Sequence, residues 1–240
     1  MVEAEDFAFY EKIKVPPPTW CPECRFIRRL TWRNERVFYK RICGLCKKSI
    51  IATSSESSAP IVYCQSCWWS DKWDPLQYGR EYDFSKTFFE QLADLYKRVP
   101  QINLWSFTNG ENCDYANLCA YSKDIYLSIS AINSEYIYYS VIADKSYNSM
   151  DSYALDGCTF CYEAIDATRC NNCSFILNSR ECADSNFLFD CVNCQNCFMS
   201  SNLRNRQYYI RNKPYSKKDY LLEMGKIRRN SYVTQKKLRK

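Results

Sequence analysis

Small and apolar residues recur at twelve-residue intervals through the second half of the chain. One series contains Cys158, Cys170, Cys182 and Cys194, and continues backward through Ser146, Ser134, Ser122 and Gly110. A second series runs Cys113, Ile125, Ile137, Ser149, Cys161, Cys173, Ser185 and Cys197. Two more are Asn117, Ile129, Val141, Tyr153, Ile165, Leu177 and Phe189, and Cys119, Ala131, Ala143, Leu155, Ala167, Ser179, Cys191 and Leu203. Series that hold size and polarity over about eight turns indicate a true structural repeat.

A period of twelve is too short for a helix-pair repeat and suits one coil of a narrow parallel β-solenoid. Equivalent residues would then stack at the strand spacing of roughly 4.8 Å. We expect the small Cys, Ser, Ala and Gly side chains to point inward, because a thin coil has little internal space. Only five Gly occur in the chain, so Asn and Asp such as Asn133, Asp156 and Asn172 are expected to make the turns.

Apolar stripes predict one helix on each side of the repeat. Ser85 is a candidate N-cap for a helix over 86–98, which Pro100 would end. Ser216, followed three residues later by Asp219, resembles a capping box that opens a second helix, and this helix is expected to cap the open end of the solenoid. The basic segment 226–240 is expected to be frayed.

Three Cys-x-x-Cys pairs occur in the first seventy residues: Cys21/Cys24, Cys43/Cys46 and Cys64/Cys67. Two such pairs complete the tetrahedral four-sulfur shell that structural zinc prefers. We favour a zinc site built from the second and third pairs, because a hairpin of a strand near 47–51 and a return at 60–63 would close it. Pairing of Cys21/Cys24 with Cys43/Cys46 is the alternative, and six plain buried thiols would be the non-functional interpretation.

The cysteines of the repeat favour a different role from those of the first seventy residues. Serine occupies the same series in earlier coils, and serine replaces a small inward thiol but not a zinc thiolate. A ladder of reduced thiols is therefore the favoured interpretation. A second zinc at Cys158, Cys161, Cys170 and Cys173, and disulfide bonds, are the alternatives.

Charge is distributed in blocks that the net value of +6 conceals. Residues 21–48 hold nine basic residues against two acidic ones, and residues 202–240 hold thirteen against two. The repeat over 110–201 is acidic, with four basic residues against twelve acidic ones.

Arginines between the first two cysteine pairs alternate with aromatic residues, which combines phosphate contacts with stacking surfaces. The candidate nucleic-acid contacts are Arg25, Arg28, Arg29, Trp32, Arg33 and Arg36. An amphipathic helix with its aromatic residues in the core is the alternative interpretation.

The chain contains sixteen Cys and no His, which excludes Ser-His-Asp, Cys-His, HExxH and facial-triad chemistry. We therefore expect a protein that is not an enzyme. The first residues do not form a basic segment followed by an apolar one, and no stretch reaches the roughly 18 apolar residues of a membrane span. The expected location is the cytoplasm, where thiols stay reduced.

Several motifs together resemble an uncharacterised bacterial family that combines a zinc-ribbon start with a Cys/Asn/Tyr-rich repeat. They include Cys-Pro-Glu-Cys-Arg from Cys21, Trp32-Arg-Asn-Glu-Arg36, Cys67-Trp-Trp-Ser-Asp-Lys-Trp-Asp74 and Tyr78-Gly-Arg-Glu-Tyr-Asp-Phe84. The resemblance implies zinc and architecture but no activity. The opening Cys-Pro-x-Cys-Arg is also loosely similar to zinc-knuckle proteins of the small ribosomal subunit.

The sequence thus predicts a mostly β protein. It would consist of an N-terminal arm (1–20), a zinc module like a zinc ribbon or treble clef (21–84), a connecting helix (85–100), the solenoid (101–209) and a C-terminal capping helix with a basic tail (210–240). The expected function is that of a non-enzymatic zinc-binding protein that contacts nucleic acid through its basic ends, with RNA favoured over DNA and ribosomal RNA or the ribosome as the candidate partner. The alternative function is a protein-interaction scaffold that uses the solenoid surface.

Overall fold

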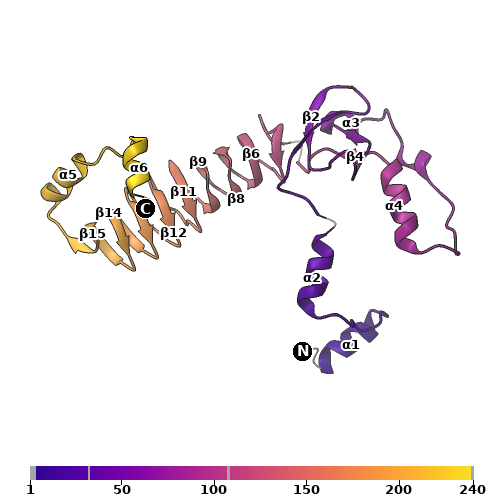
Figure 1. Ribbon diagram of the computed structural model, residues 1–240, viewed down its shortest axis with the longest axis horizontal. Coiled ribbons are helices and arrows are strands. Elements are labelled where there is room, and N and C mark those ends of the chain that lie inside the picture. The colour runs from indigo at the N-terminus through magenta and orange to yellow at the C-terminus, as the bar shows by residue number, and fades with distance from the viewer. Residues whose placement is uncertain (1–3, 32, 107–108, 239–240) are drawn as a thin grey trace.

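The computed structural model describes residues 4–31, 33–106 and 109–238. An arm of two helices, a small mixed module, a long β-solenoid and two C-terminal helices follow one another along the chain (Figure 1). The arm comprises α1 (Ala4–Lys12) and α2 (Pro22–Leu30), which project from the module. The mostly β architecture predicted from the sequence is confirmed.

The module contains two short sheets, two α-helices and a 3-10 turn. Strand β1 (Tyr39–Ile42) pairs antiparallel with β2 (Ser49–Ala52), and β3 (Val62–Tyr63) pairs parallel with β4 (Gln101–Ile102). Its helices are α3 (Gln65–Trp68), the 3-10 turn η1 (Pro75–Tyr78) and α4 (Phe88–Arg98). The predicted hairpin between 47–51 and 60–63 is therefore wrong. The hairpin is instead formed by β1 and β2 around the Cys43/Cys46 pair, where the N–H of Cys43 donates to the carbonyl of Lys48 at 2.9 Å and Lys47 adopts φ 63°.

Arg41 in β1 holds the loop that follows β2. Its side chain is buried, and its guanidinium donates to the carbonyls of Ser54 at 2.7 Å and Ala59 at 2.8 Å. Five N–H donors in one rigid group suit this contact with several carbonyls. Arg41, although part of the first basic block, is thus a structural residue whose buried guanidinium does not face a ligand.

Helix α4 begins two residues later than the sequence predicts. Thr87 is its N-cap, and its hydroxyl accepts from the N–H of Glu90 while the Glu90 carboxylate accepts from the N–H of Thr87. This reciprocal pair is a capping box. Ser85 instead donates to the carboxylate of Asp83 at 2.6 Å, so it belongs to the preceding turn.

The solenoid consists of short strands that pair in parallel at a separation of twelve residues. Val141 pairs with Tyr153, Ser174 with Asn186, and Val192 with Arg204. This register confirms the period read from the sequence. The strands are β5 (Tyr115–Asn117), β6 (Lys123–Ile132), β7 (Glu135–Tyr138), β8 (Val141–Asp144), β9 (Tyr147–Met150), β10 (Tyr153–Asp156), β11 (Cys161–Ile165), β12 (Ser174–Leu177), β13 (Asn186–Phe189), β14 (Val192–Ser201) and β15 (Arg204–Ile210).

Every third residue of the coil points into the solenoid. In one coil these inward residues are Ser152, Leu155, Cys158 and Cys161, and all four are buried. The residue two positions after an inward residue has a positive φ, as at Ala154 (φ 55°), and this bend turns the chain at each corner. Asn and Asp occupy many corners, because they tolerate the left-handed region better than most residues.

One inward series was missed by the sequence analysis. It comprises Ala116, Ser128, Ser140, Ser152, Ala164, Ile176, Leu188 and Ser200, all of them buried. In the later coils, the apolar series that contains Ile165, Leu177 and Phe189 lies on the outer surface, where these three side chains are exposed. Each side of the coil is three residues long, and only one of these three residues can face the narrow interior. This explains why one series is buried and the other is exposed.

Two helices follow the last coil. Helix α5 (Lys217–Gly225) has Ser216 as its N-cap, as predicted, and packs Tyr220 and Met224 against Phe198 on the outer side of the coil. Strand β16 (Lys213–Pro214) pairs antiparallel with the edge of β15. Helix α6 (Tyr232–Leu238) occupies the segment that was expected to be frayed. Together β16 and α5 protect an edge that would otherwise offer unpaired backbone groups.

Candidate metal centre

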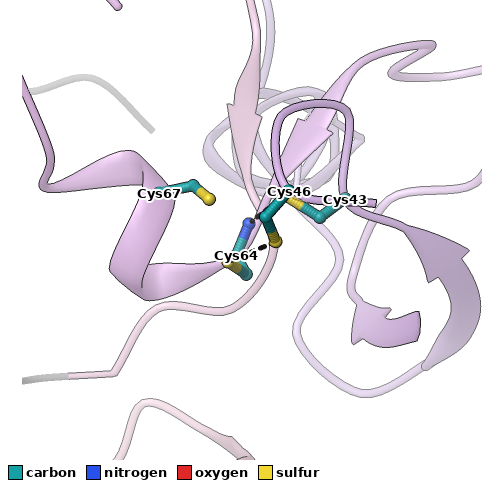
Figure 2. A group of neighbouring side chains, drawn as sticks. All are labelled: Cys43, Cys46, Cys64 and Cys67. Atoms are coloured by element: carbon teal, nitrogen blue, oxygen red, sulfur yellow. Dashed lines mark hydrogen bonds between the residues drawn. The ribbon is translucent and has the colours of Figure 1, made fainter. Parts of the chain in front are cut away.

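Four cysteines of the module converge at one point. Cys43 and Cys46 lie in the tight turn between β1 and β2, Cys64 is the N-cap of α3, and Cys67 lies on that helix (Figure 2). The four sulfur atoms all lie within 4.8 Å of one another. The structure therefore brings together the pairs that the sequence analysis favoured, even though a different hairpin positions them.

Hydrogen bonds hold the four side chains in this arrangement. The N–H of Cys64 donates to Sγ of Cys43 at 3.3 Å, and Sγ of Cys46 lies 3.7 Å from Sγ of Cys64. Cys43 and Cys67 are buried, while Cys46 is exposed. The group is thus anchored from inside the module and open on one side.

Gly44 allows the turn to approach the rest of the module. A Cβ atom at this position would lie 3.1 Å from both Ile61 and Tyr63, which is closer than ordinary van der Waals contact. Tyr63 in turn packs edge-on against Trp73, with ring centroids 5.4 Å apart. The turn that carries Cys43 and Cys46 is therefore seated on an aromatic cluster.

The electrostatic environment gives the thiols of the group different pKa values. Burial raises the pKa of Cys43, but hydrogen bonds from the backbone N–H groups of Cys64, Cys46 and Leu45 outweigh it and lower that pKa to about 6. Burial and the neighbouring thiols raise the pKa of Cys67 to about 12. The backbone N–H groups therefore favour a thiolate at Cys43, whereas burial favours the neutral thiol at Cys67.

Four sulfur ligands at mutual contact distance suit a tetrahedral metal ion. A soft, thiolate-only set excludes Mg²⁺ and Ca²⁺, which prefer oxygen, and is typical of structural zinc. A ring of backbone N–H groups around the sulfurs would stabilise the negative charge of the bound state. The group could hold a metal ion, and the residues present fit zinc.

Cys21 and Cys24 do not belong to this group. They lie at the start of α2 on the projecting arm, and both are exposed. The N–H of Cys24 donates to Sγ of Cys21 at 3.3 Å, and this hydrogen bond lowers the pKa of Cys21. The alternative pairing of Cys21/Cys24 with Cys43/Cys46 is not the one that the structure brings together.

The candidate nucleic-acid residues fall into distinct environments. Arg28, Arg29 and Arg36 are exposed, whereas Arg25 donates to the hydroxyl of Tyr10 at 3.2 Å and Arg33 pairs with Glu35 at 2.5 Å. Trp32 lies outside the described residues. Arg33 is exposed as well, but its ion pair with Glu35 leaves Arg28, Arg29 and Arg36 as the described members of the set available to a phosphate.

Helix α2 is amphipathic, as the alternative interpretation of this segment required, but its apolar side is not part of a core. Phe26, Ile27 and Leu30 are 54%, 55% and 45% exposed. Arg28 lies over the Trp20 ring, with its guanidinium carbon 5.2 Å from the centroid. The helix therefore presents an arginine surface and an apolar surface at the same time.

The cysteines of the solenoid make the contacts that serines make at equivalent positions. Sγ of Cys170 donates to the carbonyls of Thr168 and Ser179, each at 3.4 Å, two residues before and nine residues after it. Oγ of Ser134 donates to the carbonyls of Ile132 and Ala143 with the same separations. Among the described residues, the solenoid cysteines are free thiols and form no metal-sized group like that of the module. This supports the interpretation as a ladder of reduced thiols.

A groove on the outside of the first coils was not anticipated from the sequence. It has a volume of about 460 Å³, and Tyr115 and Tyr126 form part of its wall with their ring centroids 5.5 Å apart. Tyr138, Tyr139 and Met150 also line it, together with Asp114 and Asp124. The signal in the sequence was the density of tyrosine on consecutive outward positions.

Comparisons of the chain with models of known protein families, with curated proteins and with solved structures found no match. The resemblance to a bacterial family therefore stays a prediction. None of the helices in the described parts of the chain has the length and apolar character needed to cross a membrane.

Proposed function

We propose that the protein is a non-enzymatic zinc-binding protein that contacts nucleic acid through its basic ends. RNA is favoured over DNA, and ribosomal RNA in the cytoplasm is the specific form of the proposal. The observation that carries it is the surface of α2, where Arg28 and Arg29 are exposed beside the aromatic rings of Trp20 and Phe26. Guanidinium groups next to aromatic faces suit phosphates and unstacked bases.

Within the described residues, neither Arg28 nor Arg29 is paired with a carboxylate. An exposed and unpaired arginine keeps its full electrostatic attraction for a polyanion. The metal centre supports this surface indirectly, because it orders the hairpin of β1 and β2 from which the arm extends.

The acidic solenoid separates the two basic ends. About eight coils stacked at roughly 4.8 Å place them about 40 Å apart, and Figure 1 shows the arm-bearing module and the C-terminal helices at opposite ends of the solenoid. A polyanion would therefore be bound at the ends and repelled along the middle. The solenoid serves as a rigid spacer in this proposal.

The test is a binding titration with a labelled single-stranded RNA at several salt concentrations. Replacing Arg28 and Arg29 with Ala should weaken binding and reduce the salt slope by about 0.7 for each lost phosphate contact. Arg33→Ala should have a smaller effect because Arg33 pairs with Glu35. Glu163→Gln with Asp166→Asn, on the acidic coil, is the control and should leave binding unchanged or slightly stronger. A wild-type protein that binds no nucleic acid at low salt would refute the proposal.

The second candidate function is a protein-interaction scaffold, and the tyrosine-lined groove favours it. Tyrosine faces flanked by Asp114 and Asp124 suit a cationic partner, since cation–π contacts and carboxylates both attract positive charge. Tyr126→Ala with Tyr139→Ala would then abolish binding of a lysine-rich or arginine-rich peptide. The same variant would leave RNA binding unchanged, so the two candidates are separable.

A further inference from the structure

Cys21 and Cys24 repeat the helix half of the four-cysteine group. In both pairs the first cysteine is the N-cap of a helix in extended conformation: φ −61° and ψ 156° at Cys21, φ −69° and ψ 162° at Cys64. In both pairs the second cysteine lies three residues later, in the first helical turn. The arm therefore presents two thiols with the local backbone that supplies two ligands in the module.

No ligand from the described parts of the same chain completes this second set. The only group of metal-ligating side chains found there is the one formed by Cys43, Cys46, Cys64 and Cys67. Both Cys21 and Cys24 are exposed on an arm that stands clear of the module (Figure 1). A tetrahedral zinc needs four ligands, so the pair is half of a site.

We infer that Cys21 and Cys24 bind a zinc ion together with the same two cysteines of a second copy of this chain, so that the metal joins two arms. A two-fold axis through the metal converts two identical half-sites into one tetrahedral four-sulfur shell. Each of the four thiols loses its proton to solvent as its bond to Zn²⁺ forms. No oxidant or reductant is involved.

The apolar surface of α2 is an independent reason to choose a second copy as the partner. Phe26, Ile27 and Leu30 are about half exposed on the helix that begins at the half-site. Two such helices brought together at one metal would cover each other's apolar residues, which stabilises association. A small metal ligand or a single free thiol compound would leave this surface in water.

The charges of α2 are compatible with the metal bridge. Zinc with four thiolates carries a net charge of −2, and Arg25, Arg28 and Arg29 lie within the first turns after the half-site. Positive side chains nearby reduce the repulsion among the four sulfurs. The bridge would also place two arginine surfaces side by side, although the inference does not depend on any contact with nucleic acid.

The experiment measures zinc content and molecular mass on the full-length protein in a non-chelating reductant. We expect about 1.5 zinc ions per chain, and a species with twice the mass of one chain. The double variant Cys21→Ser, Cys24→Ser should be monomeric and keep about one zinc per chain, which also shows that the module remains folded. The matched control, Cys194→Ser with Cys197→Ser, changes a pair of the same spacing inside the solenoid and should remain dimeric.

A monomeric wild-type chain with one zinc, or a monomer with two, would overturn the inference. A dimer that persists in chelator and is lost only in reductant would also overturn it, because a disulfide would then join the chains. Mixing tagged and untagged copies supplies a second readout. The tagged chain should retain the untagged one with zinc present and release it when chelator is added.

Discussion

The module and the solenoid both carry Cys-x-x-Cys pairs, yet they use them in opposite ways. In the module, a tight turn and a helix start direct Cys43, Cys46, Cys64 and Cys67 to one point. In the solenoid, inward thiols such as Cys173 donate to backbone carbonyls two residues before and nine after them, as Ser122 does. Spacing alone therefore does not define a metal site. The backbone conformation decides whether the sulfurs meet each other or the main chain.

The same contrast appears in the acidity of the thiols. Backbone N–H groups around Cys43 overcome its burial and lower its pKa to about 6. Burial raises the pKa of Cys182 to about 12 and that of Cys197 to about 11. At Cys43 the backbone stabilises the thiolate form, which a metal requires, whereas burial at Cys182 and Cys197 stabilises the neutral thiol.

The largest expected effect comes from exchanging sulfur for oxygen in the module. Cys64→Ser should release the zinc of the four-cysteine group and unfold the module around it, since structural zinc contributes on the order of 10 kcal/mol to folding of such small units. Metal analysis of freshly purified protein and segment-resolved hydrogen exchange measure both consequences. Retention of stoichiometric zinc by this variant, or absence of zinc from the wild type, would contradict the metal assignment.

A smaller effect is expected from removing an inward hydroxyl of the solenoid. Oγ of Ser134 donates to the carbonyls of Ile132 and Ala143 and accepts from the N–H of Ser146 at 3.0 Å. Ser134→Ala removes the hydroxyl that accepts from the N–H of Ser146 and should lower the free energy of unfolding by about 1–3 kcal/mol. Ser134→Cys, which retains a donor, should cost less in the same urea titration. Equal losses in both variants would show that the hydrogen bonds contribute little.

Alkaline pH should weaken the solenoid before it affects thiolate-based metal binding. The folded pKa values of Cys182 and Cys197 lie above their ordinary value of 9.0. Their contribution to stability is therefore complete below pH 9 and is lost as the pH rises through 11 to 12. Urea denaturation at increasing pH measures this, and Cys197→Ser should flatten the dependence. A free energy of unfolding that rises over this range would contradict the assignment.

The smallest effect is expected for Cys182→Ser. Sγ of Cys182 donates to the carbonyls of Arg180 at 3.2 Å and Cys191 at 3.6 Å, and a serine hydroxyl makes the same two contacts elsewhere in the coil. We expect a change of less than about 1 kcal/mol in the free energy of unfolding and no change in zinc content. Loss of metal from this variant would reveal a second site within the repeat.

The sequence by itself determined the period of the solenoid and the three cysteine pairs from which the metal centre is drawn. Coils of a repeat contact their neighbours at a constant separation, so the pairing of Val141 with Tyr153 is already present in the recurrence of residue types. The thiols at 43, 46, 64 and 67 are likewise restricted by local turns, because each pair spans only three residues. The N-cap of α5 at Ser216 could also be predicted, because its side chain bonds to the N–H of Asp219 only three residues later.

Tertiary structure decided the features that depend on distant partners. Strand β3 pairs with β4, almost forty residues later, and not with β2, because the turn at Cys43 already joins β1 to β2. Arg41 looks like a member of a basic surface until its carbonyl partners in the next loop are known. The apolar side of α2 predicts burial, and only the fold shows that the chain leaves it uncovered. Composition and periodicity do not show which residues from distant parts of the chain pack against a given side chain. Those neighbours decide whether the side chain is buried in a core, bonded to another segment or exposed on the surface.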